Sequence, residues 1–309
     1  METIFNNASE FIFILCGFVS FNAAYQALGN ERARIGTVAF WTLLGVVFIF
    51  GKVIPYEVTG GLLLVMGCLT MCKQVEIGKF KAPDIEKRKA SSEEIKNLIF
   101  LPAILVAMVA LILSRVKIDG LPLPGAVMVG AGCILALFFA MLLCRPKFTE
   151  TRTDTARLLM QVGSASLLPQ LLGALGQVFT KAGVGDVISG IISGLLPEGN
   201  ILFGVVIYCL GMVIFTMIMG NAFAAFSVIT VGIGIPFVIA QGGNPSVVGA
   251  LGMTAGYCGT LMTPMAANFN IVPTAVLETK DKWTVVKAQA PMALTLIVIH
   301  IVLMLVLAF

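Results

Sequence analysis

The sequence predicts an all-α, polytopic membrane protein: a bundle of transmembrane helices with a re-entrant hairpin and broken helices. The chain of 309 residues is 58% hydrophobic and only 12% charged, whereas about 25% of residues are charged in soluble domains. In addition, residues 199–277 contain no Asp, Glu, Lys, Arg or His. One bilayer crossing needs about 20 residues, so this stretch holds several elements, and the whole chain has room for roughly eight to ten.

The first half of the chain contains five apolar segments that are long enough to cross a bilayer. Residues 1–10 hold no Lys or Arg and so lack the basic region of a cleaved signal peptide. We therefore expect the first apolar segment to stay in the protein as its first helix. We interpret residues 1–157 as a scaffold or oligomerisation region. Its predicted spans are residues 11–28, 35–54, 57–72, 97–114 and 123–144.

Lys and Arg are distributed unequally between the loops. One set of alternate loops holds thirteen of them and the opposite set holds three. The first set is residues 29–34, 73–96 and 145–158, and the second is residues 1–10, 51–56 and 115–122. Because loops rich in Lys and Arg stay in the cytoplasm, we expect an outside N-terminus, in the plasma (cytoplasmic) membrane of a prokaryote.

Residues 158–309 form the second predicted region, which resembles a transport domain. Residues 158–180 carry no charge, but a run of small residues from Gly163 leads to Pro169 in their middle. Proline lacks a backbone N–H and disfavours helix at the residue before it. The segment is therefore either a kinked span or a re-entrant hairpin with its tip near Pro169, and we favour the hairpin.

The remaining elements follow from apolar length and periodicity. Residues 183–194 place Ile and Val at helical spacing, which predicts a short helix that lies along the membrane interface or links two spans. Further helices are predicted at residues 201–219, 222–240 and 246–258, followed by a broken region to residue 276 and a last span at residues 288–309.

Small and polar residues break the uncharged stretch twice, at Gly220 and between Gly259 and Pro264. A helix interrupted at membrane depth exposes N–H groups that attract anions and carbonyl groups that can coordinate Na⁺. The alternative is close helix packing with kinks. The candidate substrate- or ion-binding residues are Asn221, Ser227, Thr260, Thr263, Asn268 and Asn270, with Ser164, Ser166 and Gln170 at the hairpin.

The sequence favours neither an enzyme nor a nucleic-acid-binding protein. It has no HExxH, Walker or GxSxG motif, and its single histidine, His300, lies on an apolar helix. We expect no cofactor, and either Na⁺ or H⁺ as a coupling ion. Proton carriers place ionisable groups in their pathway, and the nearest here are Asp186 and Glu278, so Na⁺ is slightly favoured. The alternative of an intramembrane enzyme depends on Cys258 alone.

Three motifs resemble the membrane family filed as domain of unknown function 979: Pro169–Gly176, Ala182–Gly185 and Gly220–Phe226. This resemblance covers essentially the whole chain. Residues 170–185 also resemble the hairpin region of gluconate-permease and C4-dicarboxylate carriers of the ion transporter superfamily. The second resemblance implies an elevator-type secondary carrier for small organic anions. The first implies a companion small membrane protein and, from the genes that neighbour its members, an amino acid or a 5-oxoproline-like solute.

These carriers contain two inverted repeats, and this chain is short for two complete copies. A companion subunit could supply the other half, or a compact fold could hold both repeats. We therefore expect a secondary active transporter, or one half of a two-subunit transporter, for a small carboxylate-bearing solute or amino acid. It would act in the lipid bilayer as a homo-oligomer or with its companion. The alternative is a non-transporting membrane scaffold or accessory subunit.

Overall fold

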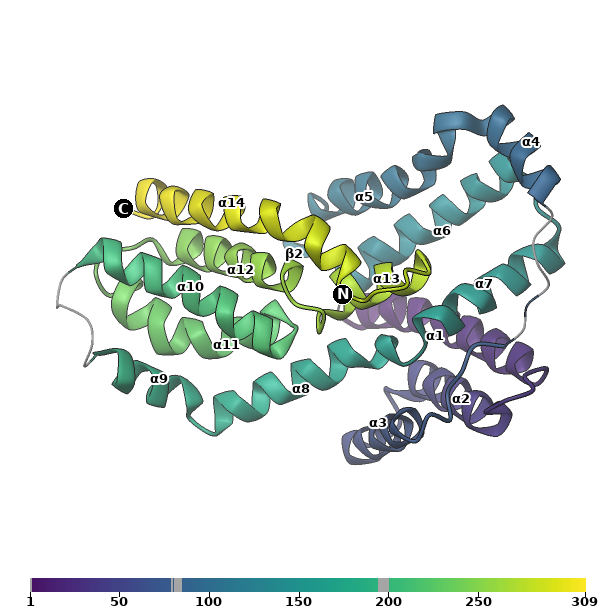
Figure 1. Ribbon diagram of the computed structural model, residues 1–309, viewed down its shortest axis with the longest axis horizontal. Helices are drawn as coiled ribbons and strands as arrows, with labels where there is room; N and C mark the ends of the chain where they lie inside the picture. The colour runs from purple at the N-terminus through teal and green to yellow at the C-terminus, as the bar shows by residue number, and fades with distance from the viewer. Residues whose placement is uncertain (1, 79, 81–84, 194–199) are drawn as a thin grey trace. The chain divides into compact units, whose positions relative to one another are not determined.

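A computed structural model describes residues 2–78, 80, 85–193 and 200–309. The chain divides into two compact units, Met1–Gly163 and Ser164–Phe309, and helices dominate both (Figure 1). The boundary lies six residues beyond the predicted one because helix α7 continues to Val162, where Gly163 with φ 53° ends it. Glycine adopts positive φ without a steric penalty, so it is the usual residue at such a stop.

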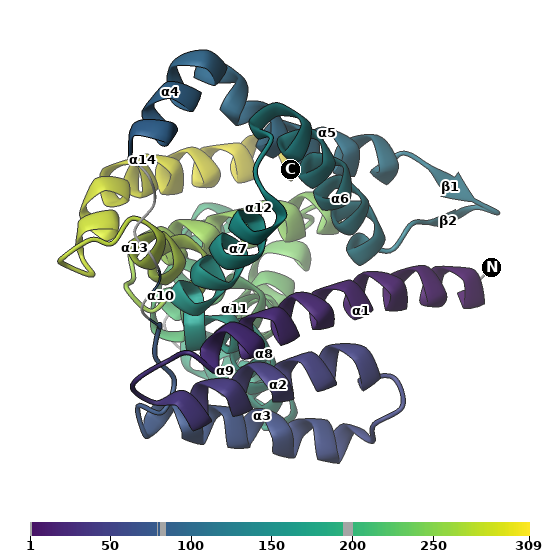
Figure 2. The same ribbon diagram turned by 90° about the vertical axis from the view of Figure 1, so that its right-hand side faces the viewer.

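The first unit has a helix at each of the five predicted spans: α1, α2, α3, α5 and α6. Its elements are α1 (Glu2–Ala27), α2 (Arg34–Phe50), α3 (Tyr56–Met71), α4 (Ile85–Ile95), the 3₁₀-helix η1 (Lys96–Phe100), α5 (Leu101–Ser114), strands β1 (Lys117–Ile118) and β2 (Leu121–Pro122), α6 (Gly125–Cys144) and α7 (Phe148–Val162). The strands form a small antiparallel hairpin that joins α5 to α6. In Figure 2, α1, α2 and α3 lie side by side.

Glycines bring the helices of this unit close together. A Cβ on Gly17 of α1 would lie 3.0 Å from the carbonyl oxygen of Gly45 on α2, and a Cβ on Gly45 would lie 3.2 Å from that of Gly17. On α6, Gly132 faces the backbone of Val106 on α5 in the same way. Membrane helices associate largely through such small-residue contacts, because lipid provides no hydrophobic driving force between them.

The second unit contains the helices of the uncharged stretch, residues 199–277, and the elements before and after it. They are the 3₁₀-helix η2 (Gly163–Leu167), α8 (Leu168–Lys181), α9 (Val184–Ser193), α10 (Ile201–Met219), α11 (Ala222–Ile229), the π-helix η3 (Thr230–Ile239), α12 (Pro245–Leu261), the π-helix η4 (Ala267–Ile271), α13 (Val272–Val276) and α14 (Thr284–Leu307). Helices α10, α12 and α14 lie side by side (Figure 1). The short helix α9 packs against η3, where a Cβ on Gly232 would lie 2.6 Å from the carbonyl oxygen of Gly185.

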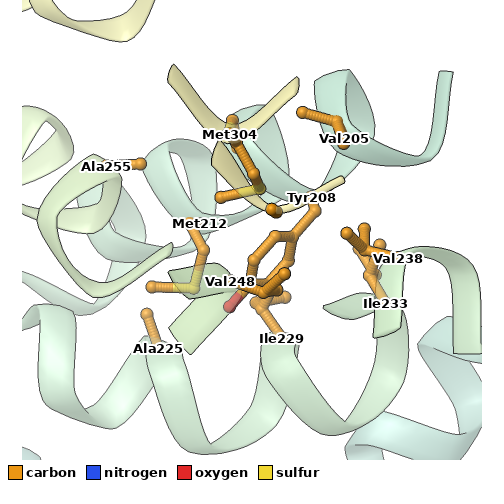
Figure 3. Packing of buried hydrophobic residues seen from close by; sticks show 12 residues of the cluster. Val205, Tyr208, Met212, Ala225, Ile229, Ile233, Val238, Val248, Ala255 and Met304 are labelled. Atoms are coloured by element: carbon orange, nitrogen blue, oxygen red, sulfur yellow. The ribbon is translucent and has the colours of Figure 1, made fainter. Parts of the chain in front are cut away.

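The core of this unit surrounds Tyr208 of α10, which is fully buried (Figure 3). Its hydroxyl group lies 2.9 Å from Oγ1 of Thr230, so the one polar atom of this side chain is hydrogen-bonded. Three glycines of α12 pack against α10: Gly252 against Tyr208, Gly256 against Met212, and Gly259 against Val213. The contact with Val213 shows that Gly259 permits close helix packing. Close packing was the alternative to a helix break at this residue.

Two predicted break positions are wrong in detail. Helix α12 continues through Gly259 and ends at Leu261, so the break lies at residues 262–266 and contains Pro264. The other break lies at Gly163–Leu167, and α8 already includes Pro169 in its first turn. Proline is tolerated there because N–H groups in the first turn of a helix have no intrahelical acceptor. Its lack of an N–H group therefore removes no helix hydrogen bond. The re-entrant hairpin, favoured over a kinked span, stays a prediction.

The described part of the chain contains six helices that are long and apolar enough to cross a membrane. They lie in residues 4–27, 89–114, 125–144, 201–219, 222–239 and 284–307. Helices α2 and α3 are apolar but shorter, at 17 and 16 residues. Large apolar side chains are exposed along many of these helices, as expected of surfaces that face lipid. The protein is therefore a multi-pass, membrane-embedded helix bundle.

Candidate functional site

Two breaks in the second unit, one at Gly220 and one at residues 262–266, meet around a small pocket. Helix α10 ends at Gly220, which has φ 69°, and α11 starts directly after Asn221. A Cβ on Gly220 would lie 2.7 Å from the carbonyl oxygen of Met265, so the backbone of the second break lies against the first. The pocket has a volume of about 40 Å³ and is lined by Leu172, Gly220, Asn221, Ala222, Phe223, Tyr257, Thr260, Ala266, Ala267, Asn268 and Phe269.

The first break presents the N-terminus of α11 to this pocket. Asn221 is the N-cap of the helix, and its Oδ1 accepts hydrogen bonds from the backbone N–H of Phe223 at 2.8 Å and of Ala224 at 3.4 Å. An Asn in this position satisfies N–H groups that have no partner inside the helix. The positive end of the helix dipole therefore lies at the pocket wall and favours a negative charge there.

The second break is held together by Asn270. Its side chain is 1% exposed, and its Nδ2 donates to the carbonyl oxygens of Thr260 at 2.7 Å and Thr263 at 2.8 Å. These bonds tie the C-terminal end of α12 to η4 across the non-helical segment. The two threonine hydroxyls make local bonds: that of Thr260 donates to the carbonyl of Tyr257, and that of Thr263 accepts from the N–H of Met265.

Three aromatic rings form an apolar wall of the pocket. The ring of Tyr257 contacts that of Phe223 edge-on, with centroids 6.0 Å apart, and that of Phe269 at 5.7 Å. Sequence analysis did not single out these rings. Their positions gave a usable signal: Phe223 lies two residues after Asn221, Phe269 lies between Asn268 and Asn270, and Tyr257 lies about one helical turn before Thr260.

The predicted site residues fall into four groups. Asn221, Thr260 and Asn268 line the pocket, and Thr263 and Asn270 support its wall. Ser227 lies outside the lining: its hydroxyl donates to the carbonyl of Ala224 and lies 3.3 Å from Oγ1 of Thr180 on α8. From the predicted hairpin, Ser166 lies in η2 outside the lining, and the side chains of Ser164 and Gln170 lie outside the described part of the chain.

Helix α8 contributes one side chain to the pocket, Leu172. Helix α8 packs against α11 through Gly176, where an added Cβ would lie 2.8 Å from the Cα of Ala224. Among the described side chains of α8, the contact with the pocket is therefore apolar, and the predicted contribution of Ser164 and Gln170 lies outside the described part of the chain. None of the described lining residues carries a formal charge, and the described residues contain no group of three His, Cys, Asp or Glu that could hold a metal ion.

The fold and the site together define a polytopic helical membrane protein whose second unit holds a small, uncharged pocket between two helix breaks. A model of the family described as Protein of unknown function (DUF979) matches residues 10–309. The chain belongs to this family. No curated protein and no solved structure matches it, and the likeness to gluconate-permease and C4-dicarboxylate carriers is not shown by these comparisons.

Proposed function

We propose that this protein is a secondary active transporter, or one half of a two-subunit transporter, for a small organic anion or amino acid. The observation that carries the proposal is the meeting of two helix breaks around a pocket, within a stretch that has no charged residue. Non-helical backbone at membrane depth is tolerated where it is buried in protein or lines a polar cavity. Secondary transporters place their substrate and ion sites at such breaks.

The chemistry of the pocket favours a carboxylate-bearing solute. The N-terminus of α11 supplies a positive dipole end, and the amides of Asn221 and Asn268 supply polar groups. The rings of Phe223, Tyr257 and Phe269 provide an apolar surface for the body of the solute. With no carboxylate in the lining to repel it, an anionic head group has both attraction and access.

The size of the pocket favours a mechanism in which the site opens and closes. Its volume of about 40 Å³ holds roughly three water-sized molecules, since one needs about 10–15 Å³. This space fits a carboxylate head group but not a whole amino acid. Binding therefore requires movement around the pocket, as in elevator-type alternating access, or a further wall from a companion subunit.

The loop charges favour an outside N-terminus in a prokaryotic plasma membrane.

Transport can be tested with the purified chain in liposomes, alone and together with its companion protein. Uptake of radiolabelled small carboxylates and amino acids is measured with and without a Na⁺ gradient. Asn221→Ala should abolish or strongly reduce uptake. Asn244→Ala is the matched control, because Asn244 caps α12 with the same pair of bonds, to Ser246 N at 3.0 Å and Val247 N at 3.4 Å, and is not a lining residue of the pocket.

Each result decides between transport and a structural role. Uptake that survives Asn244→Ala and fails with Asn221→Ala supports the pocket as the substrate site. Equal losses in the two variants contradict it, because they would show that cap removal alone stops transport. If a correctly assembled protein takes up nothing from a broad panel, the non-transporting scaffold or accessory subunit is the better hypothesis.

A further inference from the structure

Helix α2, which lies beside α1 and α3 (Figure 2), carries an open apolar groove in the first unit. The groove has a volume of about 750 Å³, within the range of about 300–1,000 Å³ that is typical of small-molecule sites. Its described lining is Leu28, in the turn after α1, and six residues of α2: Arg34, Ile35, Val38, Ala39, Thr42 and Leu43. Of these residues only Arg34 is charged, and it lies at the end of the groove where α2 begins.

The spacing of the lining residues shows how the groove runs. The residues of α2 form two rows with the spacing i, i+4, i+8, one starting at Arg34 and the other at Ile35. Ala39, the smallest lining residue, lies in the middle of the second row. Residues 34–43 rise by about 13 Å along the helix axis, which is close to the thickness of one leaflet of the hydrocarbon core, about 15 Å. The groove therefore runs from one membrane surface, where α2 begins, to about the middle of the bilayer.

Arg34 has no partner within the described part of the chain. Its side chain is exposed, and its guanidinium group makes no ion pair or hydrogen bond with any described residue. The loop at residues 72–78 packs against this end of α2 through hydrogen bonds between Thr37 and Glu76. The formal charges of residues 28–33 and 72–78, two basic and two acidic, cancel. Arg34 therefore sets the sign of the charge at the groove.

We propose that the groove binds one acyl chain of an anionic phospholipid, whose phosphate group contacts Arg34. A guanidinium group can pair with phosphate through two parallel N–H bonds. The first residue of α2 has no side-chain cap before it, so its N–H group adds to the attraction. An anionic phospholipid fits both parts of the groove, because its charge lies at the membrane surface and its chain extends through one leaflet. This site rests on the embedding of the chain in a membrane and not on the proposed transport.

A second copy of this chain is the competing occupant of the groove, and the charge of Arg34 disfavours it. Copies in one membrane share one orientation, so a two-fold contact through this face would place both Arg34 side chains at the same depth. Like charges that face each other weaken an interface. In addition, the two glycines inside α2, which permit close helix approach, face other segments of the same chain: Gly36 lies against Gln74 and Gly45 against Phe21.

The first test measures lipid binding to the full-length protein in detergent. Thermal unfolding is followed with dioleoyl-phosphatidylglycerol, with dioleoyl-phosphatidylcholine at equal concentration, and with inorganic phosphate. A ligand that binds the folded state raises the unfolding midpoint as its concentration rises above Kd. Phosphatidylglycerol should raise the midpoint more than phosphatidylcholine, and phosphate should leave it unchanged. Equal effects of the two lipids overturn the proposal, and so does an equal rise with phosphate, which would show an anion site that needs no acyl chain.

The second test removes the charge at the end of the groove. Arg34→Gln should weaken the apparent affinity for phosphatidylglycerol at least about tenfold, the effect of losing a hydrogen bond to a charged group. Arg115→Gln is the matched control, because Arg115 is also exposed at the end of a membrane helix, α5, and does not line the groove. It should keep the wild-type affinity. Equal affinities in all three proteins, or equal losses in both variants, overturn the site.

The third test fills the groove and examines the competing occupant. Ala39→Trp changes no charge and should weaken the affinity for phosphatidylglycerol, and an unchanged affinity would place the acyl chain elsewhere and overturn the proposal. Light scattering then gives the mass of the protein in its detergent complex, which should equal that of the wild type. If Ala39→Trp instead converts a dimer to a monomer and neither lipid is preferred, a second copy covers the groove and the lipid site is refuted.

Discussion

Replacement of Gly220 by Ala tests whether the contact between the two breaks positions the pocket. Two costs add at this residue. Its φ of 69° is left-handed, which costs a residue with a Cβ about 1–2 kcal/mol. The new Cβ would also lie 2.7 Å from the oxygen and 3.0 Å from the carbon of the Met265 carbonyl, and forcing an atom into a packed backbone costs about 1–3 kcal/mol.

Together these terms predict a destabilisation of roughly 2–5 kcal/mol. For a unit of this size, 1 kcal/mol moves the unfolding midpoint by about 2–4 °C, so Gly220→Ala should unfold about 4–20 °C earlier than the wild type. The assay is thermal unfolding of the purified protein in detergent, followed by tryptophan fluorescence. Uptake in liposomes should fall as well, because Gly220 and the residues next to the contact, Asn221 and Ala266, line the pocket.

Two other glycines of the same unit separate the two costs. Gly242 has φ 104° but no atom within 4 Å of its Cβ position, so Gly242→Ala should incur backbone strain alone, about 1–3 kcal/mol. Gly173, inside α8, has neither a positive φ nor a close neighbour, so Ala there should stabilise the helix by about 0.5–1 kcal/mol. If Gly220→Ala behaves like Gly242→Ala, the carbonyl contact contributes nothing. If it behaves like Gly173→Ala, the whole reasoning is refuted.

Three further predictions follow from single contacts. Asn221→Asp keeps the cap of α11 and should leave the unfolding midpoint within about 2 °C of the wild type. Its added negative charge should raise the KM for uptake of an anionic solute. An unchanged KM would argue against an anion at this helix end. Thr180→Val removes the hydroxyl that lies 3.3 Å from Ser227, which should cost about 0.5–1.5 kcal/mol and leave uptake unchanged, since neither residue lines the pocket. In a cysteine-free background, a membrane-impermeant maleimide should label Asp119→Cys in intact cells and Arg32→Cys only after lysis; the reverse pattern would invert the predicted orientation.

The order and approximate bounds of the apolar helices could be predicted from the sequence because each depends on a local property, whereas α4 and α7 lie largely in the segments 73–96 and 145–158, which were expected to be loops. Apolar length fixed α10, and the pair Gly220 and Asn221 marked its end, since one residue tolerates positive φ and the other caps the next helix. Local signals failed where one residue type serves two purposes. Pro169 breaks a helix interior but suits a first turn, and Gly259 permits close packing as readily as a kink.

The pocket could not be predicted from the sequence because it depends on contacts between distant segments. Nothing local states that the carbonyl of Met265 lies against Gly220, which is 45 positions earlier in the numbering. The role of Asn270 has the same origin: its bonds to Thr260 and Thr263 exist only because the chain turns back after α12. Sequence composition identified the polar residues of the breaks, and tertiary packing decided which of them face the pocket.

An uncharged pocket inside a membrane has to obtain its electrostatic field from the backbone. Here the N-terminus of α11 and the C-terminus of α12 meet at one place, since Asn221 and Thr260 line the same pocket. The first end favours an anion and the second a cation. Transferring either ion alone from water to this site is expensive, whereas two opposite charges at adjacent helix ends would each meet a dipole end of the favourable sign. If the proposed transport function holds, we therefore expect the anionic solute to bind together with a cation, since the described lining offers no Asp, Glu, Lys, Arg or His to hold a charge.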